Sequence, residues 1–148
     1  MRAAVGLGSS LGPRHRHLER AVGALARSPG VELLRCSRTY RTPPLRGGRA
    51  TGWFLNAVAL FEVQLDPMEI LARCIAVEQG AGRRRATYWG DRTLDLDLLL
   101  VEGTTIRTPV LTVPHPALAQ RPFVLQPLLE VWPDAAHPAD GTRFADSG

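Results

Sequence analysis

The 148-residue sequence predicts a single α+β domain, in which helices pack on an antiparallel-containing β-sheet of the ferredoxin-like type. Two observations lead to this prediction. Segments rich in β-formers and segments of helical periodicity follow one another in the order β-α-β-β-α-β. The length is that of one domain, and such a chain buries roughly 68 to 70 % of its unfolded surface, so its core needs no disulfide. We expect the domain to span 1–134 and a short polar tail over 135–148 to be poorly ordered.

The first half of the pattern is a strand, a helix and a second strand. Apart from Arg2, residues 2–7 are apolar and end near glycines, which predicts a buried strand that runs into a loop over 8–12. After Pro13, apolar residues recur at spacings of three and four, which predicts an amphipathic helix that stops at 28–30. Residues 31–40 are rich in β-formers and predict the second strand. The apolar stripe of the helix consists of Leu18, Ala21, Val22 and Leu25.

A strand, a helix and a strand follow in the second half. Residues 54–63 predict a strand. Asp66, Pro67 and Glu69 combine an N-cap acid, a proline at the first helical position and a glutamate three residues after the cap, which predicts a helix start. Residues 93–101 alternate, so four leucines share one face and both aspartates of the segment point to the other. The leucines are Leu94, Leu96, Leu98 and Leu100.

Composition excludes several classes of protein. All 18 basic side chains are arginines, and with 14 acidic side chains they leave a net charge of +4. A chain without lysine cannot use a Walker-type phosphate loop, a lysine Schiff base or a lysine general base. Cys36 and Cys74 form no C-x-x-C motif, and no apolar run approaches the ~18 residues of a membrane span. We therefore expect a cytoplasmic protein in a reducing compartment.

Three glycines near the N-terminus partly resemble a dinucleotide-binding motif. Gly6, Gly8 and Gly12 give G-x-G-x-x-x-G, which is one residue longer than the dinucleotide-binding pattern. We interpret this pattern as a turn motif.

Asp95 and Asp97 are the most informative pair of side chains. Two residues along a strand lie about 6.5 to 7 Å apart, so two carboxylates on one face can hold one hard cation or share two. Magnesium prefers such sites, where substrate phosphates and water complete its coordination. A D-x-D pair alone is equally typical of a solvated strand face.

Four arginines shortly before this pair favour the metal interpretation. Guanidinium groups bind phosphate oxygens and carboxylates bind the accompanying cation, so together they are typical of a magnesium–polyphosphate site. A plain salt bridge between Arg92 and one of the aspartates is the alternative. The four residues are Arg83, Arg84, Arg85 and Arg92.

Several other side chains could contact a ligand, and for some of them a purely structural role is the alternative. Glu78 falls on the apolar stripe of its helix, where a structural ion pair with an arginine is the simpler interpretation and ligand contact the other. His115 lies between two prolines that fix its orientation. Trp89 lies in a polar segment and Asn56 follows Phe54, so an aromatic surface and an amide edge are available to a flat heteroaromatic ligand. Core burial is the alternative for the aromatic rings.

Taken together, several segments resemble the 6-hydroxymethyl-7,8-dihydropterin pyrophosphokinase family of folate biosynthesis. The resemblance implies an α-β-α sandwich with a ferredoxin-like core. It implies an enzyme that transfers the terminal pyrophosphoryl group of ATP to the pterin hydroxymethyl group and releases AMP. It also implies two Mg²⁺ ions and two small-molecule substrates. We expect no nucleic-acid or membrane partner, and among the possible oligomeric states we favour a monomer. The segments are GLGSSLG, SRTYRTPPL, FLNAVALFE, WGDRTLDLDLLL and VPHPALAQRPFVLQPLLE.

The resemblance also implies roles for individual residues. Asp95 and Asp97 would hold the magnesium ions, and a pterin ring would lie between Phe54 and Phe123. The implied catalytic set is Arg83, Arg85, Arg92, Asp95 and Asp97. The implied ATP-binding residues are Glu78, Arg83, Arg85, Trp89, Arg92, Thr112, His115 and Arg121. The implied pterin-binding residues are Gly8, Thr42, Pro43, Pro44, Leu45, Phe54, Asn56, Trp89 and Phe123.

Two other functions compete with this interpretation. A nucleotidyltransferase also combines a glycine-serine turn with a strand-borne D-x-D, but Ser9 and Asp95 lie far apart in this sequence. An RNA-binding module would account for the positive charge, but the aromatic residues show no regular interleaving with the arginines. Salt-sensitive retention of RNA without nucleotide turnover would support the second alternative.

Overall fold

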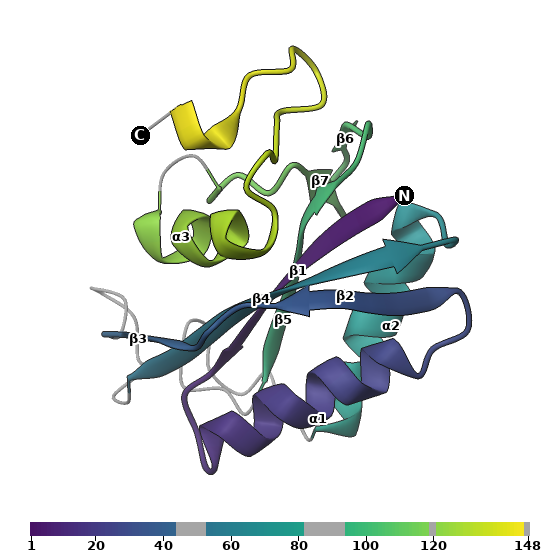
Figure 1. Ribbon diagram of the computed structural model, residues 1–148. Helices are drawn as coiled ribbons and strands as arrows, with labels where there is room; N and C mark the ends of the chain where they lie inside the picture. The colour runs from purple at the N-terminus through teal and green to yellow at the C-terminus, as the bar shows by residue number, and fades with distance from the viewer. Residues whose placement is uncertain (44–52, 82–93, 119–120, 147–148) are drawn as a thin grey trace.

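The computed structural model describes residues 1–43, 53–81, 94–118 and 121–146. Over these residues it confirms the α+β fold: one main sheet carries helices on both faces (Figure 1). The helices α1 (Arg14–Ala26) and α2 (Pro67–Gly80) cover one face, and α3 (Pro122–Val131) covers the other. None of the described helices is long and apolar enough to cross a membrane.

The main sheet is antiparallel throughout and has the strand order β2-β4-β1-β5. A short strand, β3, pairs with β4 on the same side as β2. With the first and third long strands of the chain side by side at its centre, this is the order that a β-α-β-β-α-β ferredoxin-like core requires. The strands are β1 (Arg2–Ser9), β2 (Val31–Cys36), β3 (Tyr40–Thr42), β4 (Phe54–Val63) and β5 (Asp95–Val101); a separate pair is β6 (Ile106–Arg107) and β7 (Thr112–Val113).

The segment expected to form one strand over 31–40 forms two, β2 and β3. Ser37 separates them, because its hydroxyl accepts the backbone N–H of Val58 at 2.9 Å in the place of a strand carbonyl. The N–H of Ser37 still donates to the carbonyl of Val58 at 2.9 Å. The ladder therefore pauses at Ser37 and resumes at Tyr40, which pairs with Asn56.

Both long helices begin and pack as expected. The Asp66 side chain accepts the N–H of Glu69 at 3.0 Å, and the Glu69 side chain accepts the N–H of Asp66 at 3.3 Å, so the capping box is confirmed. Leu18, Ala21 and Leu25 of α1 are buried. They contribute to a core cluster between the sheet and the two helices that also includes residues of β1, β4 and β5.

A second core cluster lies between the other face of the sheet and α3. It includes Leu60, Leu100 and Leu128, and also Ala135 and Phe144 from the end of the chain. The expected poorly ordered tail is therefore wrong for 135–146, because Phe144 is only 5 % exposed. A β-bridge between Ala136 and Arg143 folds this segment back, and the short helix η1 (Phe144–Asp146) inserts the ring. The small and polar residues of this segment predicted disorder, and they did not indicate that the single aromatic ring of Phe144 would be buried.

The alternation expected along 93–101 holds only for the first part of β5. Leu96 and Leu98 pack toward α2, but the pairing shifts by one residue between Val5 and Ala4 of β1. Val5 lies opposite Leu98 and Ala4 lies opposite Leu100, so Leu99 is the extra residue of a β-bulge. Leu100 consequently joins the cluster under α3, and the expectation that it shares a face with the other leucines is wrong.

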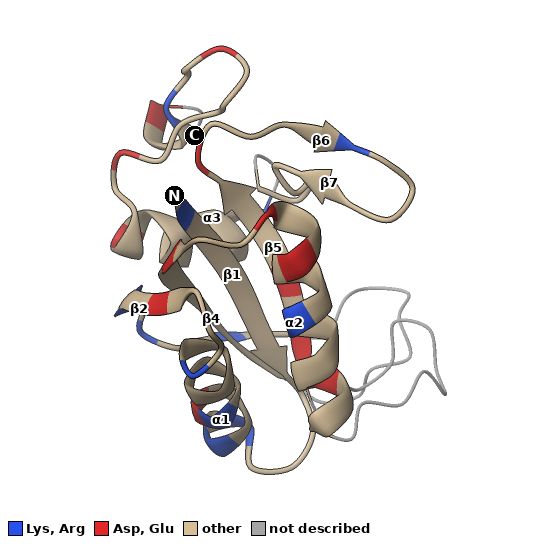
Figure 2. Ribbon diagram, turned by 90° about the vertical axis from the view of Figure 1, so that its right-hand side faces the viewer, with Lys and Arg blue, Asp and Glu red and all other residues tan. Residues whose placement is uncertain are grey.

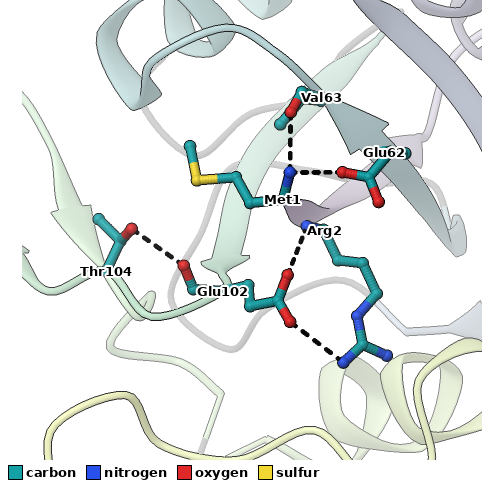
Figure 3. A network of polar contacts seen from close by, with 6 residues as sticks. All are labelled: Met1, Arg2, Glu62, Val63, Glu102 and Thr104. Carbon is teal, nitrogen blue, oxygen red and sulfur yellow. Dashed lines mark hydrogen bonds and ion pairs between the residues drawn. The ribbon is translucent and has the colours of Figure 1, made fainter.

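The end of the sheet at the start of β1 is fixed by polar contacts (Figure 3). The amino group of Met1 donates to the Val63 carbonyl at 3.0 Å and to the Glu62 carboxylate. The backbone N–H of Arg2 donates to Glu102 Oε1 at 3.0 Å. These bonds tie β1 to the end of β4 and to the end of β5, which holds the register of all three strands.

Candidate active site

A cavity of about 430 Å³ opens on the α3 face of the sheet. Its walls come from β1, β3, β4 and β5, from the segment around residue 115 and from the start of α3. The cavity therefore collects residues from most of the length of the chain. Ten of the residues expected at the site line it: Gly8, Thr42, Pro43, Phe54, Asn56, Asp95, Asp97, His115, Arg121 and Phe123.

The floor of the cavity is formed where β1 has no side chains. Gly8 lies in register between Asn56 of β4 and Asp95 of β5, and Gly6 lies in register between Val58 and Asp97. A Cβ atom at Gly8 would lie 3.1 Å from Asn56 Oδ1. The interpretation of the glycines as a turn motif is therefore wrong for Gly6 and Gly8, which lie inside β1, and right for Gly12, which lies beyond the strand at a positive φ of 65°. At Gly8 the missing side chain leaves the space that Asn56 and Asp95 face.

Asp95 and Asp97 face this space together, as the alternation predicts. Asp95 is half-buried and Asp97 is exposed, with 48 % of its side chain accessible. Figure 2 shows the acidic residues of β5 and α2 in red. In the described parts of the chain no three His, Cys, Asp or Glu side chains gather as a metal cluster. A pair of carboxylates in an open cavity nevertheless fits a hard cation that takes its remaining oxygens from a substrate and from water.

His115 stands beside the aspartates in a fixed orientation. Its backbone N–H donates to the Leu99 carbonyl at 2.7 Å, and its ring Nδ1 accepts the N–H of Ala117 at 3.1 Å. Burial, and then the positive charge of Arg121, lower the pKa of His115, while Asp95 acts in the opposite direction. The ring is therefore neutral at neutral pH, and because Nδ1 is an acceptor the proton resides on Nε2.

Nε2 of His115 lies near Asp97. Nε2 lies 3.9 Å from Asp97 Oδ1, which is too long for a hydrogen bond. Since Nε2 makes no hydrogen bond to Asp97, its N–H is oriented for donation to an oxygen atom of a ligand that enters the cavity beside the carboxylate.

The other end of the cavity offers an amide and aromatic rings. Asn56 Nδ2 donates to Thr42 Oγ1 at 2.7 Å, which fixes the orientation of the amide. Phe54 and Phe123 both line the cavity, and the Arg121 guanidinium lies 5.9 Å from the centre of the Phe123 ring. These groups suit a flat ring whose edge carries hydrogen-bonding groups and whose faces are apolar.

Glu78 lies on the opposite face of the sheet, on α2. It is only 6 % exposed, and its Oε2 accepts the backbone N–H of Leu96 at 2.7 Å. Leu96 lies between Asp95 and Asp97, so this bond from α2 holds the part of β5 that carries both aspartates. Because β5 is an edge strand, its outward N–H needs such an acceptor.

Cys74, one turn before Glu78 on α2, belongs to the same buried layer. Burial, followed by the negative charges of Glu78 and Asp97, raises the pKa of its thiol to about 12. The thiol is therefore protonated at neutral pH and has no nucleophilic role in this layer.

The remaining expected residues are not placed at the cavity by the structure. Thr112 lies on β7 and is not among the residues that line it. Six others lie outside the described residues: Pro44, Leu45, Arg83, Arg85, Trp89 and Arg92.

The cavity also includes residues that were not expected there. Gly6, Val58 and Leu99 could have been found, because each lies two positions along a strand from a residue that was predicted. Ala117 and Val124 line the cavity from a turn and from α3, and no local pattern in the sequence indicates this.

The chain is similar in sequence to one known family of proteins. Residues 4–133 match the family model of 7,8-dihydro-6-hydroxymethylpterin-pyrophosphokinase (HPPK). Two similar proteins, both called 2-amino-4-hydroxy-6-hydroxymethyldihydropteridine pyrophosphokinase, come from Methylorubrum extorquens and from Synechocystis. Each is 41 % identical to this chain. The match to the Methylorubrum protein covers 97 % of this chain and 90 % of that protein. The match to the Synechocystis protein covers 94 % of this chain and 70 % of that protein.

Solved structures share the fold at low sequence identity. The crystal structure of Plasmodium falciparum HPPK-DHPS with pteroate superposes with a TM-score of 0.76 at 11 % identity. The match covers 99 % of this chain and 41 % of the HPPK-DHPS chain, so this chain spans less than half the length of that protein. At this identity the similarity supports the fold alone.

Proposed function

The chain belongs to the 7,8-dihydro-6-hydroxymethylpterin-pyrophosphokinase family, and from this we infer that it transfers pyrophosphate from ATP to 6-hydroxymethyl-7,8-dihydropterin and releases AMP. The reaction is the pyrophosphoryl transfer of folate biosynthesis. One observation carries the proposal at the level of the site: a single cavity joins a ring-binding end to a pair of carboxylates. We also propose that the protein acts as a monomer in the cytoplasm.

The ring-binding end is proposed to hold the pterin. Asn56 would bond to the amide-like edge of the ring with one N–H donor and one carbonyl acceptor, in an orientation that its bond to Thr42 supports. Phe54 and Phe123 would stack on the two faces. Gly8 allows the ring to approach β1 because it has no side chain. Pro43, with Pro44 and Leu45, would border the ring.

The carboxylate end is proposed to hold the triphosphate. Asp95 and Asp97 would bind two Mg²⁺ ions, which when bound neutralise phosphate charge and make the attacking hydroxyl more acidic. The Nε2–H of His115 and the guanidinium of Arg121 would donate to phosphate oxygens, since both residues line the cavity that also contains the aspartates. The resemblance adds Glu78, Arg83, Arg85, Trp89, Arg92 and Thr112 to the proposed nucleotide contacts.

The proposed reaction is an in-line displacement at the β-phosphorus of ATP. The pterin hydroxymethyl oxygen forms a bond to this phosphorus, and the bond from it to the oxygen shared with the α-phosphate breaks. AMP leaves with that oxygen, and the hydroxyl proton passes to solvent, so the products are AMP, the pterin diphosphate and one proton. The arginines and His115 act by stabilising charge on the phosphate oxygens as it is redistributed.

Product analysis tests this function. We expect the protein with ATP, Mg²⁺ and 6-hydroxymethyl-7,8-dihydropterin to yield AMP and a pterin diphosphate in equal amounts, as measured by chromatography. ADP as the product would indicate a γ-phosphoryl kinase, and inorganic pyrophosphate a nucleotidyltransferase; either would overturn the proposal.

Two ATP analogues sharpen the test. In β,γ-methylene-ATP the bond between the α- and β-phosphates is ordinary, so the analogue should still donate its two terminal phosphorus groups as one unit. In α,β-methylene-ATP the bond that must break is replaced by carbon, so this analogue should only inhibit. The reverse pattern would contradict transfer at the β-phosphorus.

A further inference from the structure

A cluster of polar side chains outside the cavity joins two of its walls. Glu130 Oε1 accepts the phenol O–H of Tyr40 at 2.7 Å and the Nε–H of Arg38 at 2.9 Å. Glu130 Oε2 accepts the backbone N–H of Arg38. Both carboxylate oxygens are thus engaged by the segment that leads into β3. We refer to Arg38, Tyr40 and Glu130 as the clasp.

The clasp connects elements that carry cavity residues. On β3, Tyr40 lies two positions before Thr42, whose hydroxyl accepts the N–H of Asn56. On α3, Glu130 lies seven positions after Phe123, which places the two side chains on the same side of the helix two turns apart. A movement of α3 relative to β3 would therefore change the distance between Phe123 and Thr42 across the cavity.

Local interactions hold α3 only weakly. Its N-cap, Arg121, makes no side-chain capping bond, and no acidic residue lies in its first turn. Pro127 lies inside the helix and lacks the N–H for an intrahelical hydrogen bond. The helix thus depends on tertiary contacts for its position, and the apolar contacts of Leu128 and Val131 with the sheet are non-directional. The clasp adds directional contacts between this helix and β3.

We propose that Glu130, held by Tyr40 and Arg38, is a positioning residue that sets the width of the ring-binding end of the cavity and thereby the affinity for the pterin. The proposal rests on the proposed function for the identity of the ligand. It assigns the clasp no contact with the substrate, since none of its three residues lines the cavity.

The charges and exposed fractions of the three side chains indicate which contact contributes most to the clasp. The hydrogen bond from Tyr40 lowers the pKa of Glu130, and the same bond raises the pKa of Tyr40, so carboxylate and phenol keep their acceptor and donor forms at neutral pH. The Arg38 side chain is 83 % exposed, whereas that of Glu130 is 26 % exposed. An exposed ion pair contributes little, so the Tyr40–Glu130 bond is the principal contact and the Arg38 guanidinium a minor one.

The test separates pterin binding from ATP binding. We expect Tyr40→Phe and Glu130→Ala each to raise the KM for the pterin about 5- to 20-fold while the KM for ATP changes less than about twofold. Because both changes remove the Tyr40–Glu130 bond, the double variant should raise the pterin KM by less than the product of the two single effects. Arg38→Ala should raise the pterin KM less than about threefold.

A control variant and the behaviour of the double variant distinguish the clasp from an unspecific effect of mutation. Glu102→Ala is the matched control, since Glu102 also accepts a backbone N–H and an arginine guanidinium, from Arg2, but far from the cavity; its KM values should stay at the wild-type level. Unchanged pterin KM in Tyr40→Phe and Glu130→Ala, or equal increases in both KM values, would overturn the clasp. Purely additive effects in the double variant would overturn it as well.

Failure of the clasp and failure of the proposed function give different results. If the wild type forms no pterin diphosphate, the function is wrong. If the wild type is active and the clasp variants retain its pterin KM, only the clasp is wrong. Equilibrium binding of the pterin to the protein, followed by the fluorescence of the pterin, measures the same loss of affinity without turnover, and unchanged binding in both variants would contradict the proposal.

Discussion

Two halves of one face of the sheet differ in what their central strand carries. Toward the end of β1, Gly8 lies between Asn56 and Asp95, and the three positions form the open floor of the cavity. Toward the start of β1, Ala4 lies between Leu60 and Leu100 in the same register, and this row is buried under α3. The same three strands are thus closed by apolar packing at one end and open at the other.

The difference shows that side-chain size on one strand decides where the cavity lies. At the closed half, leucines from β4 and β5 reach across a small residue and meet the residues of α3 and of the chain end. At the open half, Gly8 offers no side chain, and the polar side chains of Asn56 and Asp95 on either side of it do not fill the space. The closed half supplies the stability that an open polar cavity next to it lacks.

Removing the aromatic ring that seals the closed half should produce the largest change. We expect Phe144→Ala to lower the free energy of unfolding by about 3 to 5 kcal/mol, because the ring is nearly fully buried in the second core cluster. Urea denaturation measures it. In folded protein the KM values should stay close to those of the wild type, and a change in unfolding free energy below about 1 kcal/mol would mean that the ring contributes little to this core.

Removing a carboxylate from the open half should leave the free energy of unfolding unchanged and strongly lower kcat. We expect Asp97→Ala to lower kcat about 10²- to 10³-fold, because the variant loses one of the two proposed magnesium ligands. Asp134→Ala is the control, since Asp134 is a 60 % exposed aspartate near Arg2 at the closed half; its kcat should be unchanged. Full activity of Asp97→Ala over a range of Mg²⁺ concentrations would show that this carboxylate has no role in turnover.

Adding one methyl group to the floor of the cavity should fill part of the space in the open half and weaken pterin binding. Gly8→Ala should raise the pterin KM about tenfold, a change of about 1.4 kcal/mol in binding, because the new Cβ would lie 3.1 Å from Asn56 Oδ1. Steady-state kinetics with each substrate varied in turn measures the change. Gly80→Ala at the end of α2 is the control: no atom lies within 4 Å of its Cβ position, so KM should not change.

Alkylation of the two cysteines compares a buried with an exposed part of the molecule and should have the smallest effect on the protein. At pH 8 a thiol with a pKa of about 12 is ionised to about one part in ten thousand, so native Cys74 should resist iodoacetamide. Cys36 is exposed and should react first, although burial of its sulfur and then the charge of Glu130 raise the pKa of its thiol. Mass spectrometry of the modified peptides measures both rates. Equal labelling in the native protein would contradict the burial of Cys74, and unfolding in urea should remove the difference.

Local patterns in the sequence predicted much of the fold. The α2 capping box, the buried stripe of α1 and the order of the long strands follow from periodicity and from the hydrogen-bonding capacity of a few side chains, which act within one or two turns. The shared face of Asp95 and Asp97 follows from strand geometry in the same way, because the alternation is undisturbed up to Leu98.

The tertiary structure decided the features that depend on a distant partner. The bulge at Leu99 exists only in the pairing of β5 with β1, and the break at Ser37 depends on the N–H of Val58. The burial of Phe144 needs the finished face of the sheet.

The sequence by itself therefore determined the elements, the carboxylate pair and, through its resemblance, the family. The tertiary structure decided that Gly8 forms the floor of a cavity and that Glu78 of α2 accepts a backbone N–H of β5. It also decided that Glu130 of α3 accepts the hydroxyl of Tyr40 on β3. The physical reason is the range of the forces concerned. Helix and strand periodicity is fixed by neighbouring peptide units, whereas the volume of a cavity and the partner of a buried carboxylate are fixed by chain segments that meet only after folding.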